Sequence, residues 1–173
     1  MKNSEELIEF TPIEDLFSMK ELLDMVMAIK PQEHYCYIHS CVFAVNMARI
    51  YPSIEYHEGI ITKGLFVHAW NSIVKNGRRY YFDFTGYFLA QKYKVKVNYQ
   101  AILLRTYTPN EIFKLMFKKE IQCCQIEKDG TYKKYIDRNF KEEKEEINRL
   151  MAINRKMKEH EEKHEILTPC ISY

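Results

Sequence analysis

Three side chains that together support catalysis by a thiol occur in the order Cys36, His68 and Asp83. A thiol attacks a carbonyl carbon as its thiolate, so a neighbouring base has to take the proton and a third group has to orient that base. Imidazole exchanges protons near neutral pH, and a carboxylate can hold the ring by a hydrogen bond. These residues can perform acyl-transfer chemistry if the fold brings them together.

Cys36 is expected at the start of a helix that begins near Tyr35 and continues to Arg49, before Pro52. This segment is apolar on nearly all sides, which is typical of a buried helix. The free backbone N–H groups and the dipole at a helix N-terminus favour a negative charge and would lower the pKa of the Cys36 thiol. Cys41 lies in the apolar stripe of the same helix, where burial would keep it protonated, so Cys36 is the expected nucleophile.

The dipeptide Asn76-Gly77 predicts a tight hairpin, because both central positions of a type I′ turn require a positive φ. Counting outward from a two-residue loop places Trp70 opposite Asp83 and His68 opposite Thr85. His68 and Asp83 then become diagonal neighbours on one face of the sheet, within reach of a hydrogen bond. A slip of one residue would put them on opposite faces.

This arrangement resembles a known superfamily. A Cys that opens a helix is followed by His68-Ala69-Trp70-Asn71 on one strand and Asp83-Phe84-Thr85 on the next. The order is similar to that of the transglutaminase-like and papain-like cysteine superfamily, in its transglutaminase-like and arylamine-acetyltransferase branch. Tyr56-His57-Glu58-Gly59 is similar to a segment of small bacterial and phage proteins of this kind. The roles implied by the resemblance are nucleophile for Cys36, general base for His68 and orienting carboxylate for Asp83.

The resemblance also directs attention to residues that could contact the substrate. An oxyanion could be bound by the backbone N–H of Cys36 together with Gln32 or a tyrosine. Trp70 and Asn71, beside the histidine, are further substrate candidates, although packing beneath the site is the favoured role for Trp70. His39 stands where relatives often carry Trp or Asn.

A zinc site is the competing interpretation of the cysteine-bearing segment, because His34, Cys36, His39 and Cys41 are four potential soft ligands. Their spacing does not match the usual zinc patterns, and on a helix Cys41 points away from Cys36 and His39. We therefore expect no metal and no cofactor.

Composition limits the partners. The chain has 173 residues and a formal net charge of +2, which suits one main domain and gives no electrostatic reason to expect nucleic acid. No apolar run reaches the roughly 20 residues that a membrane helix needs, and the N-terminus turns acidic at Glu5-Glu6, where a signal peptide would turn apolar. Five cysteines without regular spacing indicate free thiols, so a cytoplasmic protein without a membrane partner is expected.

The expected fold class is α+β, with a central antiparallel sheet packed on the cysteine-bearing helix. A catalytic domain over residues 1–130 would be followed by a charged helical extension over 131–173, which packs on the domain or projects from it to bind a protein or a second copy. The expected helices are 13–30, 35–49, 108–119 and 133–165, and the expected strands are 55–62, 65–74, 79–85, 94–97 and 101–107.

The function that these residues favour is acyl transfer through a thioester on Cys36, with hydrolysis of a peptide or amide bond in a peptide or protein substrate as the first choice. Two alternatives remain open. A transglutaminase or acyltransferase would use the same triad with an amine as acceptor, and a catalytically inactive protein of this fold would bind a protein partner.

Overall fold

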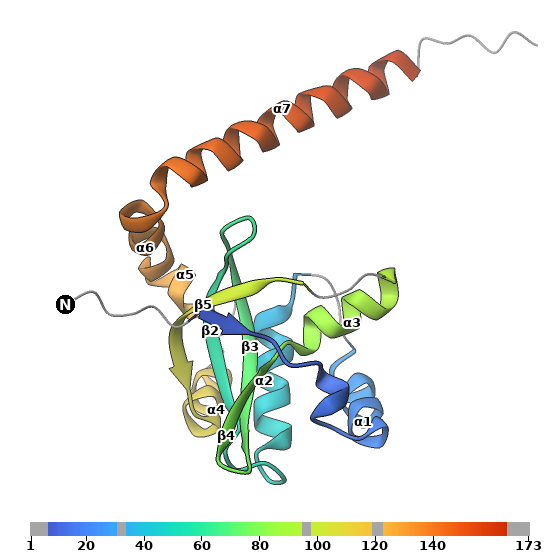
Figure 1. The fold of residues 1–173 in the computed structure, drawn as a ribbon, viewed down its shortest axis with the longest axis vertical. Helices are drawn as coiled ribbons and strands as arrows, with labels where there is room; N and C mark the ends of the chain where they lie inside the picture. The colour runs from blue at the N-terminus through green and yellow to red at the C-terminus, as the bar shows by residue number, and fades with distance from the viewer. Residues whose placement is uncertain (1–6, 31–33, 95–97, 119–122, 166–173) are drawn as a thin grey trace, which may run out of the picture. The chain divides into compact units, whose positions relative to one another are not determined.

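The computed structural model describes residues 7–30, 34–94, 98–118 and 123–165. It contains a five-stranded antiparallel sheet in the order β1-β5-β2-β3-β4, together with helices (Figure 1). The mixture of helices with an antiparallel sheet confirms the expected class at this level. The strands are β1 (Leu7–Glu9), β2 (Glu55–Ile61), β3 (Phe66–Lys75), β4 (Arg78–Phe82) and β5 (Gln100–Tyr107).

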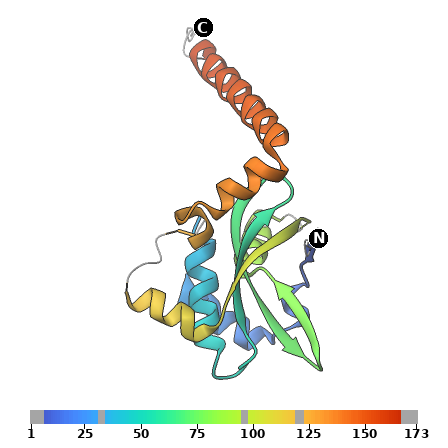
Figure 2. The same cartoon turned by 90° about the vertical axis from the view of Figure 1, so that its left-hand side faces the viewer.

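The cysteine-bearing segment forms α2, which spans Cys36–Met47 and packs along one face of the sheet (Figure 2). Phe43 and Ala44 of α2 are fully buried and share a core with Ala69 and Ile73 of β3. The helices around this core are α1 (Met19–Ile29), α3 (Phe84–Tyr93), α4 (Pro109–Phe117) and the short α5 (Gln125–Lys128).

The opposite face of the sheet is also covered. Side chains alternate along β3, so Trp70 points away from α2 and packs in a smaller cluster with Ile8 of β1, Ile61 and Ala101. Both faces of β3 are therefore buried around the residues of interest. β1 was not predicted from the sequence, because its three residues are too few to show a period.

The chain divides into two compact units, residues 1–133 and 134–173. The expected single helix from residue 133 is instead two helices, α6 (Thr131–Asn139), which crosses the boundary, and α7 (Lys141–Glu165). The side chain of Asn139, the last residue of α6, donates to the carbonyl oxygen of Tyr135 (3.0 Å). None of the described helices combines the length and apolar character needed to cross a membrane.

The hairpin register is confirmed from the turn outward. Lys75 pairs with Arg78, and the pairing continues to Asn71 opposite Phe82. Asn76 and Gly77 both adopt the positive φ that the turn requires.

The strand expected over residues 79–85 is β4 (Arg78–Phe82), which ends earlier than expected. Asp83 caps α3 by accepting a hydrogen bond from the backbone N–H of Gly86 (2.9 Å), so Thr85 lies in a helix and not opposite His68. Lys94, where another strand was expected to start, ends α3, and residues 95–97 lie outside the described part of the chain.

Two further helix starts follow from capping. α1 begins at Met19, because Ser18 and Glu21 form a capping box there. Ile13, where this helix was expected to begin, lies in a separate 3-10 turn (Ile13–Asp15). The helix expected from Thr108 is confirmed as α4, with the same kind of capping box between Thr108 and Glu111.

Candidate active site

The first turn of α2 lies against an edge of β3 that β4 leaves open. Pairing of β3 with β4 stops at Asn71, so the backbone groups of Ala69 on that side face the helix. The Ser40 hydroxyl donates to the carbonyl oxygen of Ala69 (3.1 Å), and the N–H of Ala69 donates to the sulfur of Cys36. These bonds fix the start of α2 beside His68.

The three residues expected to carry the chemistry come together here. Nε2 of His68 lies 2.5 Å from Oδ2 of Asp83, and both side chains are buried. The thiol of Cys36 is hydrogen-bonded to the same imidazole. Since Nε2 is engaged by Asp83, Nδ1 is the ring nitrogen that faces the sulfur. The site is thus a continuous Cys–His–Asp hydrogen-bonded set.

Asp83 is fixed from two further directions. Besides the N–H of Gly86 on Oδ1, the hydroxyl of Tyr99 donates to Oδ2. Burial would raise the pKa of Asp83, but the charge and hydrogen bond of His68 outweigh it, so the pKa is lowered. A Cβ at Gly86 would lie only 2.5 Å from Oδ2, which explains a glycine at this position.

Cys124 is a neighbour of Cys36 that was not predicted from the sequence. It is 3 % exposed, and a hydrogen bond between its thiol and Cys36 is the largest influence on the pKa of both residues. The carboxylate of Glu58 anchors this segment, since it accepts from the N–H groups of Gln125 (2.7 Å) and Ile126 (2.9 Å), directly after Cys124. No spacing in the sequence relates Cys124 to Cys36, because the two meet only through the fold.

These contacts favour an ion pair between the thiolate and the imidazolium. The hydrogen bond from Cys124, followed by the hydrogen bond and charge of His68, lowers the pKa of Cys36 to about 4 against the effect of burial. Burial would lower the pKa of His68, but the charge and hydrogen bond of Asp83 and the contact with Cys36 raise it to about 10. Burial raises the pKa of Cys41, as expected for an inert thiol.

Replacing Cys124 tests its hydrogen bond. A hydrogen bond to a charged group is worth about 1.5–3 kcal/mol, so Cys124→Ala should raise the pKa of Cys36 by about one to two units. The pKa is measured from the pH dependence of iodoacetamide labelling, with peptide mass spectrometry to assign the site. Cys124→Ser keeps a donor and should shift the pKa less, while an equal shift in both variants would contradict the assignment.

A pocket of about 290 Å³ lies beside the sulfur of Cys36. Three aromatic residues, Tyr37, Phe66 and Tyr132, are among those that line it, and so is the exposed Glu127. A substrate carbonyl could therefore approach the sulfur from this side.

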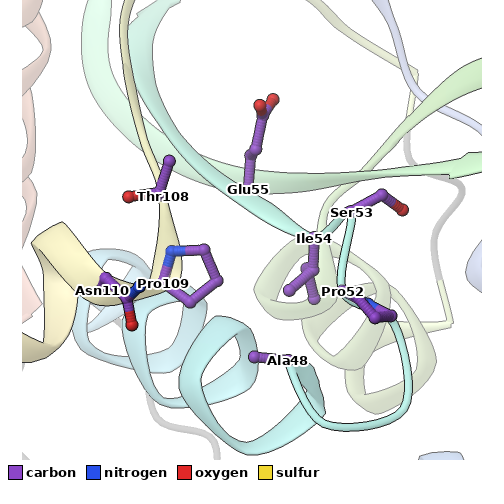
Figure 3. Close-up of a pocket in the computed structure, with 8 residues that line it drawn as sticks. All are labelled: Ala48, Pro52, Ser53, Ile54, Glu55, Thr108, Pro109 and Asn110. Carbon is purple, nitrogen blue, oxygen red and sulfur yellow. The ribbon is translucent and has the colours of Figure 1, made fainter.

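A larger pocket, of about 400 Å³, lies at the far end of α2, where Ala48 and Ile54 face Pro109 (Figure 3). Its one carboxylate, Glu55, forms an ion pair with Arg79. No cysteine or histidine is among the residues that line this pocket.

Two of the substrate candidates, Trp70 and Asn71, are fully buried, and for Trp70 this agrees with the favoured role of packing beneath the site. The ring of Trp70 packs edge-on against Phe10 (5.6 Å between ring centroids) and is stacked with the ring of His68 (6.4 Å between centroids), so it supports the imidazole from beneath. Asn71 is also fully buried, and its amide group donates to the carbonyl oxygens of Ser40 (2.9 Å) and Glu55 (3.1 Å). Neither side chain is open to a substrate.

The remaining candidates are an oxyanion donor and a metal site. Gln32 lies outside the described residues. Within the described residues no side-chain hydrogen bond caps the start of α2, which leaves the N–H of Cys36 available to an oxyanion. In the same part of the chain, no group of three or more His, Cys, Asp or Glu side chains is arranged to hold a metal ion.

Models of known protein families, curated proteins and solved structures were each compared with this chain, and none of them matches it.

Proposed function

We propose that this chain is a cysteine-dependent acyl-transfer enzyme related to the transglutaminase-like and papain-like superfamily, and that it hydrolyses a peptide or amide bond. The observation that carries the proposal is the hydrogen-bonded set of Cys36, His68 and Asp83. A thiolate beside an imidazolium, with a carboxylate behind the ring, is the arrangement that thiol catalysis requires.

The first half of the reaction forms a thioester. The Cys36 thiolate attacks the carbonyl carbon, and the negative charge that develops on the oxygen is stabilised by the backbone N–H of Cys36 and the α2 dipole. His68 then gives the proton on Nδ1 to the leaving amine, and the C–N bond breaks. Asp83 keeps the ring oriented throughout.

The second half returns the enzyme to its starting state. His68 accepts a proton from water, whose oxygen attacks the thioester carbonyl, and the C–S bond breaks to release a carboxylic acid and the thiolate. An amine in place of water would give a transglutaminase or acyltransferase on the same triad. The aromatic pocket beside the sulfur has room for a side chain of either partner.

Acylation by an activated ester tests the proposal. Incubation with p-nitrophenyl acetate should release nitrophenol in a burst and leave one acetyl group on Cys36, which intact-mass and peptide mass spectrometry detect. Cys36→Ser should lose the burst, while the matched variant Cys123→Ser should keep it. Adding a primary amine distinguishes transfer from hydrolysis, because an acyltransferase would form the amide. Equal, slow acetylation of several cysteines would instead favour an inactive binding protein.

The pH dependence of this reaction is a separate expectation. Below the pKa of Cys36, near 4, the thiolate is protonated, and above the pKa of His68, near 10, the imidazolium loses the proton that the leaving group needs. Amide hydrolysis should therefore show a broad maximum between these limbs, whereas acylation by an activated ester should lose rate only on the acid side. If the rate of ester acylation instead rose with a single pKa near 9, as for an ordinary thiol, the ion pair would be contradicted.

A further inference from the structure

We propose that Cys36 and Cys124 form a reversible disulfide that closes the site, with a peroxide as the oxidant. This goes beyond acyl transfer, since it requires only a reactive thiolate and a neighbouring thiol.

The first support is the position of Cys124. Cys124 and Cys36 line the same pocket, and their thiols lie close enough for each to shift the pKa of the other. The segment that follows is held in place at several points. Besides the hydrogen bonds that Glu58 accepts, Arg105 pairs with Asp129 (2.6 Å), and the hydroxyl of Tyr132 donates to the carbonyl oxygen of Leu65 (2.7 Å). The thiol is thus kept facing the nucleophile.

The second support is the difference between the two thiols. Cys36 faces a pocket that admits molecules much larger than a peroxide, and the hydrogen bonds to its sulfur favour the thiolate, the form that peroxides oxidise. Cys124 is buried behind it and remains a neutral thiol. The first is suited to react with the oxidant and the second to resolve the product.

The oxidation proceeds in two balanced steps. The Cys36 thiolate attacks one oxygen of the peroxide, the O–O bond breaks, and the leaving oxygen takes the proton of the His68 imidazolium, which gives a sulfenic acid and, for hydrogen peroxide, water. The sulfur of Cys124 then attacks the Cys36 sulfur. The S–S bond forms, the S–O bond breaks, and the hydroxyl leaves as water with the thiol proton of Cys124. Two electrons pass from the two sulfurs to the peroxide.

The bridge would switch the site off without destroying it. With its sulfur in a disulfide, Cys36 can neither attack a carbonyl nor be oxidised further to the irreversible sulfinic acid. A dithiol reductant restores both thiols by exchange. Cys123 precedes Cys124 and lines the same pocket, but no described hydrogen bond joins it to Cys36, so it serves as the matched control.

The experiment treats the full chain with a small excess of hydrogen peroxide, without added thiol. Free thiols are then blocked, and non-reducing peptide mass spectrometry should find a Cys36–Cys124 linked peptide in the wild type and in Cys123→Ser. After dithiothreitol, both should recover most of their iodoacetamide labelling at Cys36. Cys124→Ser should form no bridge, accumulate sulfinic acid at Cys36 and recover at least about tenfold less labelling.

Three results would overturn the proposal. They are the absence of the linked peptide, a bridge to Cys123 in its place, and recovery in Cys124→Ser equal to that of the wild type. None of them bears on acetylation of Cys36 by the activated ester, so the two proposals can fail separately.

Discussion

Replacing His68 with Ala should slow the alkylation of Cys36 by iodoacetamide at pH 5.5 by at least about tenfold. In the wild type the thiolate predominates at this pH, because the Cys36 pKa is near 4. Loss of the imidazolium removes a hydrogen bond and an opposite charge, so most of the thiol becomes protonated. The gain in intrinsic nucleophilicity at the higher pKa offsets only part of this loss.

The effect on an amide substrate should be larger than the effect on alkylation. A poor leaving group needs a proton in the transition state, and general acid–base catalysis contributes about 10²–10⁴-fold. Acylation by p-nitrophenyl acetate needs no such proton, since nitrophenolate leaves readily. His68→Ala should therefore lose far more activity toward amides than toward this ester.

His34→Ala is the matched control for both measurements. His34 lines the same pocket but is exposed and lies outside the hydrogen-bonded set. Its replacement should leave labelling of Cys36 within about twofold of wild type. An equal loss in the two variants, or full labelling of His68→Ala at pH 5.5, would contradict the assigned role of His68.

The contact between His68 and Asp83 followed from the sequence because a two-residue turn fixes strand register. The count outward from Asn76-Gly77 was right as far as Asn71 and Phe82. Beyond that point the reason for the contact differs, since Asp83 reaches the imidazole as the cap of α3. A local pattern thus predicted the pair, while the helix start that fixes Asp83 depends on a side-chain cap that outweighs the strand propensity of the segment.

The partners of the site could not be predicted in the same way. Cys124 and Tyr99 belong to segments that meet Cys36 and Asp83 only through the fold. Trp70 and Asn71 are substrate candidates in the sequence only because they follow His68 on the same strand. In the fold, Ile8 of β1 and Phe10 cover Trp70 on one face of the sheet, while Asn71 is held against α2 on the other.

Replacing Gly59 with Ala should lower the free energy of unfolding by about 3 kcal/mol or more. Gly59 lies opposite His68 in the β2–β3 pairing and follows a bulge in the pairing with β5. A Cβ at this position would lie 2.0 Å from the carbonyl oxygen of Ile102 and 2.5 Å from the ring of Trp70. The first neighbour is backbone in the adjacent strand, so relief requires the sheet to move.

The same substitution should also reach the active site, because the displaced Trp70 ring is stacked with His68. For a chain of this size, 3 kcal/mol corresponds to a fall in Tm of about 6–12 °C, which circular dichroism measures. Gly77→Ala is the control, since a Cβ there meets nothing within 4 Å and the positive φ costs about 1–2 kcal/mol. Labelling of Cys36 well below the Tm should slow in Gly59→Ala alone, since the strain at Gly77 lies in the turn. If the two alanine variants had the same Tm and the same rate of Cys36 labelling, the close packing at Gly59 would matter neither for the stability of the sheet nor for the position of His68.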